Sequence, residues 1–415
     1  MRVLLLSNIE WSDNNAFGNT MSNLFSGLDG IEVASLYRRS SMPNNNICKK
    51  YFKISYTSII KNFFKKEKIG EYFEYQQSTE TKTVQSTEKK AIGLVHKLKL
   101  NKVVYFIEDM LFATKKWENK NFKNFLENFN PNIVFCFAKA SKTHLLFIKT
   151  ILKHLPNCKF VTFIVDDIYA ANRDKRHKKI IAEQLNLASK VYAITPSLKN
   201  EYEGIFGVNI DILTKGCDFS LPVTRKQNPI KTIVYAGNLL YGRDKTLIKL
   251  AEEIKTHNDN SEDKLFLKIF SPTIVDKSVI EALNVNGASE FCGAKPFSEI
   301  VNILNKADIV LHVESFDQKQ QKVVKHSFST KITDCLQSGS VLFAVGPKGV
   351  ASMVAAKEID GSFTAFSNEE IKDIITEISK ADLYENACKI REYAKENFDI
   401  LKIRQKLLLD FNNII

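Results

Sequence analysis

Short apolar runs of strand length recur along the whole chain, and segments with helical periodicity separate them. The runs in the first half are VLLLSNI (3–9), NIVFCFA (132–138), KFVTFIV (159–165) and KVYAIT (190–195). Those in the second half are TIVYAG (232–237), LFLKIFS (265–271), SEFCG (289–293), DIVLHVE (308–314) and VLFAVG (341–346). Continuous apolar strands are typical of a parallel sheet that helices cover on both faces. The alternation therefore predicts an α/β protein with two doubly wound, Rossmann-like halves.

The length of 415 residues also favours two domains, because it exceeds what one ordinary core holds. The segment FSLPVTRKQNPI (219–230) contains two prolines and is predicted to be a linker. We expect an N-terminal domain at 1–218, a C-terminal domain at 231–395, and a helix at 396–415 that packs back on the N-terminal domain. Ligands of such sheets bind at the carboxyl ends of the strands, so we expect the two domains to face a central cleft.

The composition favours a cytosolic protein. No apolar run approaches the roughly 18 residues of a membrane-spanning helix, and the opening residues MRVLLLSNIEW are typical of a strand rather than a signal peptide. Seven cysteines are scattered without a CxxC pair, which favours reduced thiols over disulfides or zinc sites. The polar segment QQSTETKTVQSTEKK (76–90) is predicted to be a mobile loop.

The net charge of +12 is unevenly distributed. The stretch CKKYFKISYTSIIKNFFKKEKIG (48–70) holds seven lysines against one glutamate, with aromatic and aliphatic residues between them, and a second stretch at 89–107 holds five lysines and no acid. One interpretation is a face that rests on an anionic membrane surface. The other is a helix whose apolar side packs on its own domain. No nucleic-acid partner is expected, because no known nucleic-acid-binding motif accompanies the charge.

The segment YAGNLLYGRDKTL ends a strand at Gly237 and places Arg243 at the start of a helix. Glycine allows a ligand to approach the backbone, and arginine forms paired hydrogen bonds with phosphate oxygens. The alternative is an ordinary turn with a surface arginine. The sequence contains neither GxGxxG nor the Walker motif, which disfavours dinucleotide oxidoreductases and P-loop enzymes.

The segment KHSFSTKITDCLQSGSVLFAVGP (325–347) places Ser329 and Thr330 at the start of a second helix. Hydroxyls and free backbone N–H groups there can hold an anion, and Lys331 adds positive charge. Asp334, one turn later, could accept hydrogen bonds from ribose hydroxyls. A serine-capped helix with a solvent-facing aspartate is the alternative. Taken with Arg243, this segment predicts a site for a nucleoside diphosphate.

Two carboxylates follow a strand of the first half in FIVDDIYAANR. Asp166 or Asp167 could orient an acceptor hydroxyl or stabilise positive charge at the anomeric carbon of a sugar, whereas the alternative is a helix cap. The histidines show no ligand spacing, and no HxxH or strand-end DxD occurs. We therefore expect no metal and no other cofactor, with Arg243 and Lys331 neutralising the phosphate charge instead.

Three segments in order resemble the donor half of GT-B glycosyltransferases: YAGNLLYGR, FCGAKPFSEIVNILNKADIVLHVESF and SFSTKITDCLQSGSVLFAVGP. They are most similar to retaining bacterial enzymes that build capsule, O-antigen and related surface polysaccharides. In the first half, KVYAITPSLKNEY and ILTKGCDFS resemble the family's serine-bearing segment and its "NGVD" entry to the linker. The resemblance covers most of 1–20 and 110–395.

The resemblance implies roles for individual residues. Arg243 and Lys331, with Ser329 and Thr330, would bind the donor diphosphate, and Arg243 and Lys331 would act in catalysis together with Asp166 and Asp167. Asp334 would bind the ribose, where the family usually has glutamate. The other implied donor-binding positions are Gly18, Gly237, Asn238, Ser271, Lys295, Pro296, Phe297 and Glu314, of which Glu314 would contact the sugar and Lys295, Pro296 and Phe297 the base. The implied acceptor-side positions, in the first loop, are Asp13, Asn14 and Asn19.

This sequence also departs from the family pattern. The usual pair of glutamates seven residues apart is absent, ten residues (317–326) are inserted after Glu314, and Lys215 stands where the "NGVD" asparagine would be. These departures leave the sugar contacts less defined than the diphosphate contacts.

The expected function is transfer of a sugar from a UDP- or GDP-sugar to a hydroxyl of a glycan, with retention. The acceptor is expected to be a lipid-linked glycan of cell-surface polysaccharide synthesis, and the enzyme to lie on the inner face of the membrane. Two alternatives stay open: a nucleotide-sugar 2-epimerase on the same fold, and a non-catalytic GT-B partner subunit.

Overall fold

A computed structural model describes residues 1–39, 41–65, 68–75, 101–170, 174–220, 222–224, 228–326, 328–329 and 331–415, without the side chains of 63–65, 101–106 and 331. The predicted loop at 76–90 and most of the second basic stretch lie outside these residues. The chain divides into two compact units. Unit 1 comprises Met1–Ile194, Lys199–Leu213 and Arg404–Ile415, and unit 2 comprises Thr195–Leu198 and Thr214–Ile403. Unit 2 therefore begins a few residues ahead of the predicted linker.

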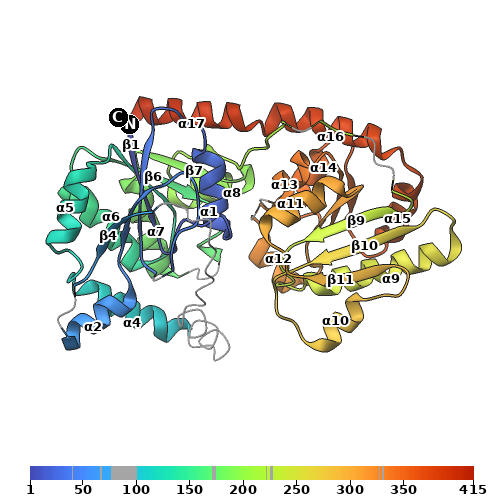
Figure 1. Cartoon of the computed structure of the whole chain (residues 1–415), viewed down its shortest axis with the longest axis horizontal. Helices are drawn as coiled ribbons and strands as arrows, with labels where there is room; N and C mark the ends of the chain where they lie inside the picture. The colour runs from blue at the N-terminus through green and yellow to red at the C-terminus, as the bar shows by residue number, and fades with distance from the viewer. Residues whose placement is uncertain are drawn as a thin grey trace. The chain divides into compact units, whose positions relative to one another are not determined.

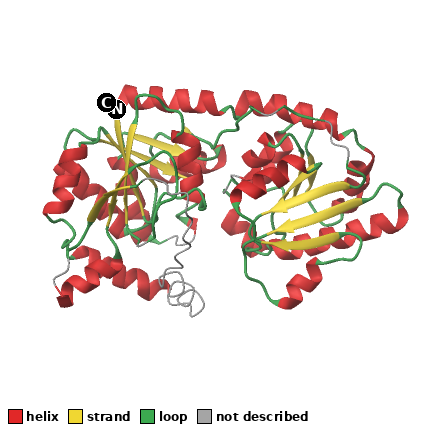
Figure 2. Cartoon of the chain, viewed as in Figure 1, coloured by secondary structure: helices red, strands yellow, loops and turns green. Residues whose placement is uncertain are grey.

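Unit 1 is built on an eight-stranded sheet with helices on its faces (Figures 1 and 2). Its strands are β1 (Arg2–Ser7), β2 (Glu32–Tyr37), β3 (Lys50–Lys53), β4 (Glu71–Glu74), β5 (Ile133–Phe137), β6 (Lys159–Ile164), β7 (Lys190–Ala193) and β8 (Asp211–Ile212). Their order is β4-β3-β2-β1-β5-β6-β7-β8, and every pair is parallel except β3 with β4. The order reverses between β1 and β5, which is the switch point at which doubly wound sheets bind ligands.

The helices that accompany this sheet begin where the sequence supplies capping residues. They are α1 (Ala16–Phe25), α2 (Tyr56–Lys65), α4 (Asn101–Ala113), α5 (Lys120–Phe129), α6 (Lys142–His154), α7 (Lys175–Leu187) and α8 (Pro196–Phe206). Asn15, Asn119, Ser141 and Asp174 cap α1, α5, α6 and α7 by accepting a backbone hydrogen bond from the first helical turn.

Aromatic residues fill much of the core of unit 1, and part of the basic stretch 48–70 contributes to it. Tyr51, Phe52 and Ile59 are fully buried, so this part of the stretch packs on its own domain. Ile60 is 42% exposed. The side chains of Phe63 and Phe64, and also Lys66, lie outside the described residues.

The segment Arg404–Ile415 completes unit 1 although it follows unit 2 in the chain. The ring of Phe411 lies 6.4 Å from that of Phe25 and 6.2 Å from that of Phe135. The Tyr192 hydroxyl donates a 2.7 Å hydrogen bond to the carboxylate of Asp410. The segment therefore belongs to the hydrophobic core of unit 1.

Unit 2 contains a six-stranded, fully parallel sheet. Its strands are β9 (Lys231–Ala236), β10 (Leu265–Phe270), β11 (Ser289–Gly293), β12 (Ile309–Val313), β13 (Val341–Val345) and β14 (Phe363–Ala365). The order β11-β10-β9-β12-β13-β14 is that of a Rossmann sheet and reverses between β9 and β12.

Helices connect and cover these strands (Figure 1). They are α9 (Arg243–Asn260), α10 (Lys277–Leu283), α11 (Phe297–Lys306), α12 (Gln318–Val324), α13 (Lys331–Gln337), α14 (Ala351–Glu358), α15 (Glu370–Lys380) and α16 (Leu383–Asn397). Helix α17 (Ile400–Ile414) follows, and its larger part, from Arg404 onward, belongs to unit 1. Helix α9 packs against both α10 and α15, while α13 packs with α16 against β13. The predicted α/β class with two parallel-sheet domains is confirmed.

Within the described part of the chain, no helix combines the length and the apolar character needed to span a bilayer. All seven cysteines carry free thiols.

Candidate functional site

The candidate site of unit 2 lies where the carboxyl ends of β9 and β12 meet. The loop after β9 turns through Tyr241 and Gly242, both with positive φ (61° and 76°). A Cβ atom on Gly242 would lie 2.6 Å from the Ser315 hydroxyl, so glycine is needed where this loop meets the segment after β12. The turn makes Arg243 the first residue of the 18-residue helix α9. Its side chain is thus placed at a helix N-terminus, where unpaired N–H groups and the helix dipole favour an anion.

Arg243 is held there by the carboxylate of Glu314, the residue that follows β12. Its Nη2 lies 3.0 Å from Oε1 and 2.9 Å from Oε2 of Glu314. Its Nε donates to the Val313 carbonyl at 3.1 Å, and its Nη1 donates to Asn238 Oδ1 at 2.7 Å. Burial disfavours the charge on Arg243, but the Glu314 carboxylate outweighs it and raises the pKa of the guanidinium above its ordinary value. These contacts fix the orientation of the Arg243 guanidinium at the switch point between β9 and β12.

The structure thus brings together Gly237, Asn238, Arg243 and Glu314 from the predicted set. Glu314, only 3% exposed, directs both carboxylate oxygens to the guanidinium. A Cβ atom on Gly346, after β13, would lie 2.9 Å from Cβ of Glu314, so the neighbouring loop also fixes this side chain. Glu314 is therefore a residue that positions Arg243.

The loops after β10 and β11 lie along the same edge of the sheet. The backbone N–H of Ser271, a buried residue, donates to the Gly293 carbonyl at 2.9 Å, and that of Gly237 donates to the Phe270 carbonyl at 2.9 Å. Lys295, Pro296 and Phe297 follow in an exposed loop at the start of α11. These predicted donor-side residues therefore share one edge of the unit 2 sheet.

Around α13 the structure describes only part of the predicted phosphate-binding set. Ser329 is half-buried, whereas Thr330 and the side chain of Lys331 lie outside the described residues. The carboxylate of Asp334 forms an ion pair with the ammonium of Lys215. The Lys215 side chain is 5% exposed and that of Asp334 is 15% exposed. Lys215 is the residue that replaces the expected asparagine, so this departure supplies the partner of the predicted ribose ligand.

In unit 1 the two predicted aspartates after β6 have different surroundings. Asp167 Oδ1 accepts hydrogen bonds from the backbone N–H groups of Tyr169 (3.2 Å) and Ala170 (2.9 Å) and from the Tyr202 hydroxyl (3.1 Å). Burial, and then the Asp167 charge, raise the pKa of Tyr202 above its ordinary range. Asp167 thus shapes its own loop, as in the capping alternative, while Asp166 is exposed.

The predicted first-loop residues lie after β1. A Cβ atom on Gly18 would lie 2.1 Å from the backbone oxygen of Ser12, so Gly18 allows α1 to pack directly against the loop. The Asp13 carboxylate accepts a hydrogen bond from the Ser22 hydroxyl, and burial raises the pKa of Asp13. Asn14 is exposed, and Asn19 is a half-buried residue of α1.

A buried charged cluster, which the sequence analysis missed, lies at the carboxyl ends of β1, β2 and β5. Arg38, after β2, is fully buried and contacts Glu108 (Nη1 to Oε1, 2.9 Å) and Asn8, which follows β1. Lys139 follows β5, and burial together with the Arg38 charge lowers its pKa to about 8. His144 is buried beside them, and its burial holds its pKa well below the ordinary value. The signal in the sequence was the pair Arg38 and Arg39 after the apolar run VASLY.

No group of three or more His, Cys, Asp or Glu side chains is placed to hold a metal ion among the residues that the structure describes.

Many solved structures share the fold of this chain, although the sequence comparisons found no match. No protein-family model matches the sequence, and neither does any curated protein. HepE from Anabaena in complex with UDP-glucose superposes with a TM-score of 0.61 at 11% identity, covering 100% of each chain. An alpha,alpha-trehalose 6-phosphate synthase from Burkholderia multivorans gives 0.62 at 9% identity, covering 100% of this chain and 98% of that one. A glycosyltransferase from Rickettsia africae gives 0.59 at 11% identity, with 100% and 98% covered.

These structures share the two-domain GT-B architecture, with a parallel Rossmann-like sheet in each domain. The present chain therefore has the GT-B fold, as the resemblance implied. At about one-tenth identity the likeness establishes the fold alone.

Proposed function

We propose that this protein is a glycosyltransferase that uses a nucleoside-diphosphate sugar, either a UDP- or a GDP-sugar, as its donor. The observation that carries the proposal is Arg243, fixed by Glu314 and Asn238 at the N-terminus of α9 and at the switch point of the unit 2 sheet. A partly buried, pre-oriented guanidinium at a helix N-terminus suits a diphosphate. The HepE structures with UDP-glucose and with UDP and glucose support a nucleotide sugar as ligand on this fold.

The chemistry would proceed by loss of the nucleoside diphosphate from the anomeric carbon. Negative charge grows on the leaving diphosphate oxygen, and Arg243 with Lys331 would stabilise it, so neither a metal nor another cofactor is needed. The Asp334 carboxylate would accept hydrogen bonds from the ribose hydroxyls. In a retaining transfer the acceptor hydroxyl attacks from the face that the diphosphate leaves, and a diphosphate oxygen takes its proton.

The acceptor is proposed to be a lipid-linked glycan of cell-surface polysaccharide synthesis, on the inner face of a membrane. Asp166 and the first-loop residues would orient its hydroxyl. Support comes from the resemblance to surface-polysaccharide enzymes and from the basic stretch 48–70, in which Ile60 and Lys61 are exposed on α2. Each lysine near an anionic surface contributes about 1 kcal/mol to membrane binding.

The proposal is tested by donor binding and by charge removal. A thermal-shift panel of UDP-, GDP-, dTDP- and CMP-sugars should identify one stabilising donor, since a ligand at about 100 times its Kd adds roughly 2.7 kcal/mol of stability. Arg243→Ala should lose at least about 100-fold in transfer rate, because it removes charge from the leaving diphosphate. Lys249→Ala, on an exposed part of the same helix, is the matched control. Full turnover in folded Arg243→Ala would contradict the assignment, and epimerised sugar from donor alone would favour the 2-epimerase alternative.

A further inference from the structure

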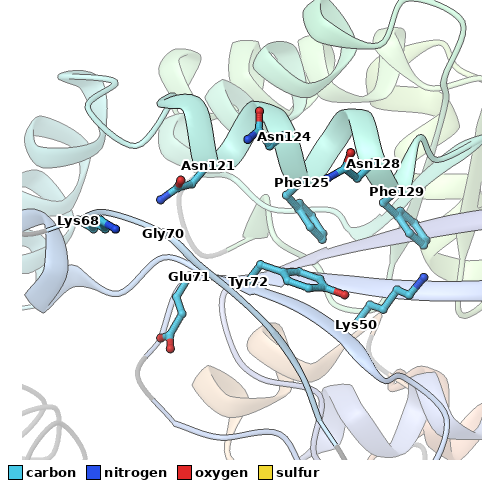
Figure 3. Close-up of a pocket in the computed structure, with 10 residues that line it drawn as sticks. All are labelled: Lys50, Lys68, Gly70, Glu71, Tyr72, Asn121, Asn124, Phe125, Asn128 and Phe129. Atoms are coloured by element: carbon cyan, nitrogen blue, oxygen red, sulfur yellow. The ribbon is translucent and has the colours of Figure 1, made fainter.

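A hollow of about 470 Å³ opens in unit 1 between the antiparallel strands β3 and β4 and helix α5, at the edge of the sheet (Figure 3). Its volume falls in the roughly 300–1,000 Å³ range of small-ligand pockets. Its walls are an amide-bearing helix face on one side and an aromatic strand on the other. Among the residues that line it are Asn121, Asn124, Asn128, Phe125, Tyr72 and Glu71.

Helix α5 presents two different faces. Phe122, Leu126 and Phe129 are buried against the core of unit 1. The three asparagines at 121, 124 and 128 follow a spacing of three and four residues, so they share a neighbouring face, and all three are exposed. Asparagine is a weak helix former, and the intrinsic stability of α5 does not account for three of them on one face. They line the hollow with amide groups that both donate and accept hydrogen bonds.

The opposite wall carries Tyr72, whose ring packs against aromatic residues of α5. Tyr72 on β4 is 48% exposed, and its ring centroid lies 6.0 Å from that of Phe125. The Tyr72 hydroxyl donates to Glu74 at 2.7 Å, while Phe125 stacks on the buried ring of Phe52 at 4.9 Å. Figure 3 shows the Tyr72 ring on the strand facing the Phe125 and Phe129 rings on the helix. An aromatic platform of this kind can pack on the C–H face of a pyranose ring.

The charged residues at the rim do not make the hollow a strong anion site. Lys50 pairs with Glu32, and Glu71 lies 3.1 Å from Lys53. Lys68 adds one positive charge to the rim. The hollow therefore combines three amides and one tyrosine ring with a single net positive charge at its rim. A neutral pyranose, which has vicinal hydroxyls and an apolar ring face, is chemically complementary to such a surface.

We propose that this hollow is a second carbohydrate-binding site, which takes one or two units of a neutral pyranose oligosaccharide. The asparagine amides bind the sugar hydroxyls, and the Tyr72 ring packs on the sugar face. The site belongs to unit 1 and uses no residue of the unit 2 donor site, so the proposal goes beyond the proposed transferase activity.

The test uses the full chain and four defined probes: maltohexaose, cellohexaose, mannohexaose and the hexamer of N-acetylglucosamine. Saturation-transfer NMR should show binding of at least one of them. Tyr72→Ala, and separately the triple change of Asn121, Asn124 and Asn128 to alanine, should each weaken that binding at least tenfold. Lys123→Ala with Glu127→Ala, on the opposite exposed side of α5, is the matched control and should bind as the wild type does.

Two further measurements separate this site from the donor site. Circular dichroism should show that both variants stay folded, because the altered side chains are exposed. Nucleotide-sugar binding should be unchanged in Tyr72→Ala, so failure of the donor assignment and failure of this one give different results. The proposal is overturned if no probe binds, if binding survives both variants, or if inorganic phosphate displaces the oligosaccharide.

Discussion

The buried pair of Arg243 and Glu314 offers the sharpest test of how the unit 2 site is held together. We consider the substitution Glu314→Gln, which keeps the shape of the side chain and removes its charge. In the native chain the carboxylate is 3% exposed and accepts from both Nε and Nη2 of Arg243. The amide leaves the guanidinium without a counter-charge and directs an N–H group toward it. A buried charge that loses its partner is the source of the expected instability.

The magnitude follows from this geometry. Removal of one partner from a buried ion pair costs about 3–5 kcal/mol, and the low end applies because the amide oxygen still accepts one hydrogen bond. For a unit of roughly 190 residues, each kcal/mol lowers Tm by about 2–4 °C. Glu314→Gln should therefore lower the Tm of unit 2 by roughly 6–12 °C. The double change Arg243→Met with Glu314→Leu should recover most of this loss, because it removes both buried charges.

The Tm of each unit is measured by calorimetry, far-UV circular dichroism and tryptophan fluorescence, which together distinguish the unfolding of unit 2 from that of unit 1. Both tryptophans, Trp11 and Trp117, are buried in unit 1, so fluorescence follows that unit while the other signals include unit 2. The control is Glu253→Gln, which breaks the partly exposed pair with Lys249 on the same helix and should cost less than about 0.5 kcal/mol. If Glu314→Gln shifts Tm no more than this control does, the reasoning is refuted.

Three further outcomes are expected. Burial, more than neighbouring charges, lowers the pKa of Lys139 to about 8. The charged form of Lys139 therefore destabilises the folded protein below pH 8, and this destabilisation disappears as the pH rises from about 8 to 10.5. In urea unfolding, Lys139→Met should stabilise the protein by up to about 3 kcal/mol at pH 7 and by almost nothing near pH 10.5. Asp334→Ala should weaken nucleotide binding and also cost about 3 kcal/mol, because Lys215 stays buried without a counter-charge; adding Lys215→Met should restore the stability but not the nucleotide affinity. Finally, wild-type protein should sediment with anionic vesicles at low salt and be released at 1 M salt, where the Debye length is about 3 Å. Changing Lys61 and Lys65 to glutamine should weaken that sedimentation. Unchanged sedimentation of this variant would mean that the basic stretch does not bind the membrane.

The sequence predicted most of the central strands, because their burial on both faces requires continuous apolar runs. The central strand β2 was missed although it contains the apolar run VASLY. The edge strand β4 and its neighbour β3 were missed as well, since each holds only two aromatic residues between charged ends (KYFK and EYFE) and the stretch 48–70 was interpreted as a basic surface. Two buried aromatic residues, Tyr51 and Phe52, belong to β3.

The site was predictable only as far as its residues act locally. The position of Arg243 at a helix start follows from the loop and strand before it. Its pairing with Glu314, 71 positions later, depends on β9 and β12 being neighbours in the sheet. The hydrophobic pattern of a single segment does not predict the order of the strands. In the same way, the pairing of Asp334 with Lys215 joins segments 119 positions apart.

The contribution of Arg404–Ile415 to the core of unit 1 has a consequence for how the protein is made. A ribosome completes unit 2 before it supplies Phe411 and Asp410, so unit 1 waits for these residues while it already holds most of its sheet. Contacts that link such distant parts of a chain form slowly, and the partly formed unit exposes Phe25 and Phe135 in the meantime. Unit 2 is almost contiguous and can fold as soon as it emerges. Heterologous expression should therefore favour the second unit on its own, and a chain shortened at 403 should depend on chaperones to stay in solution.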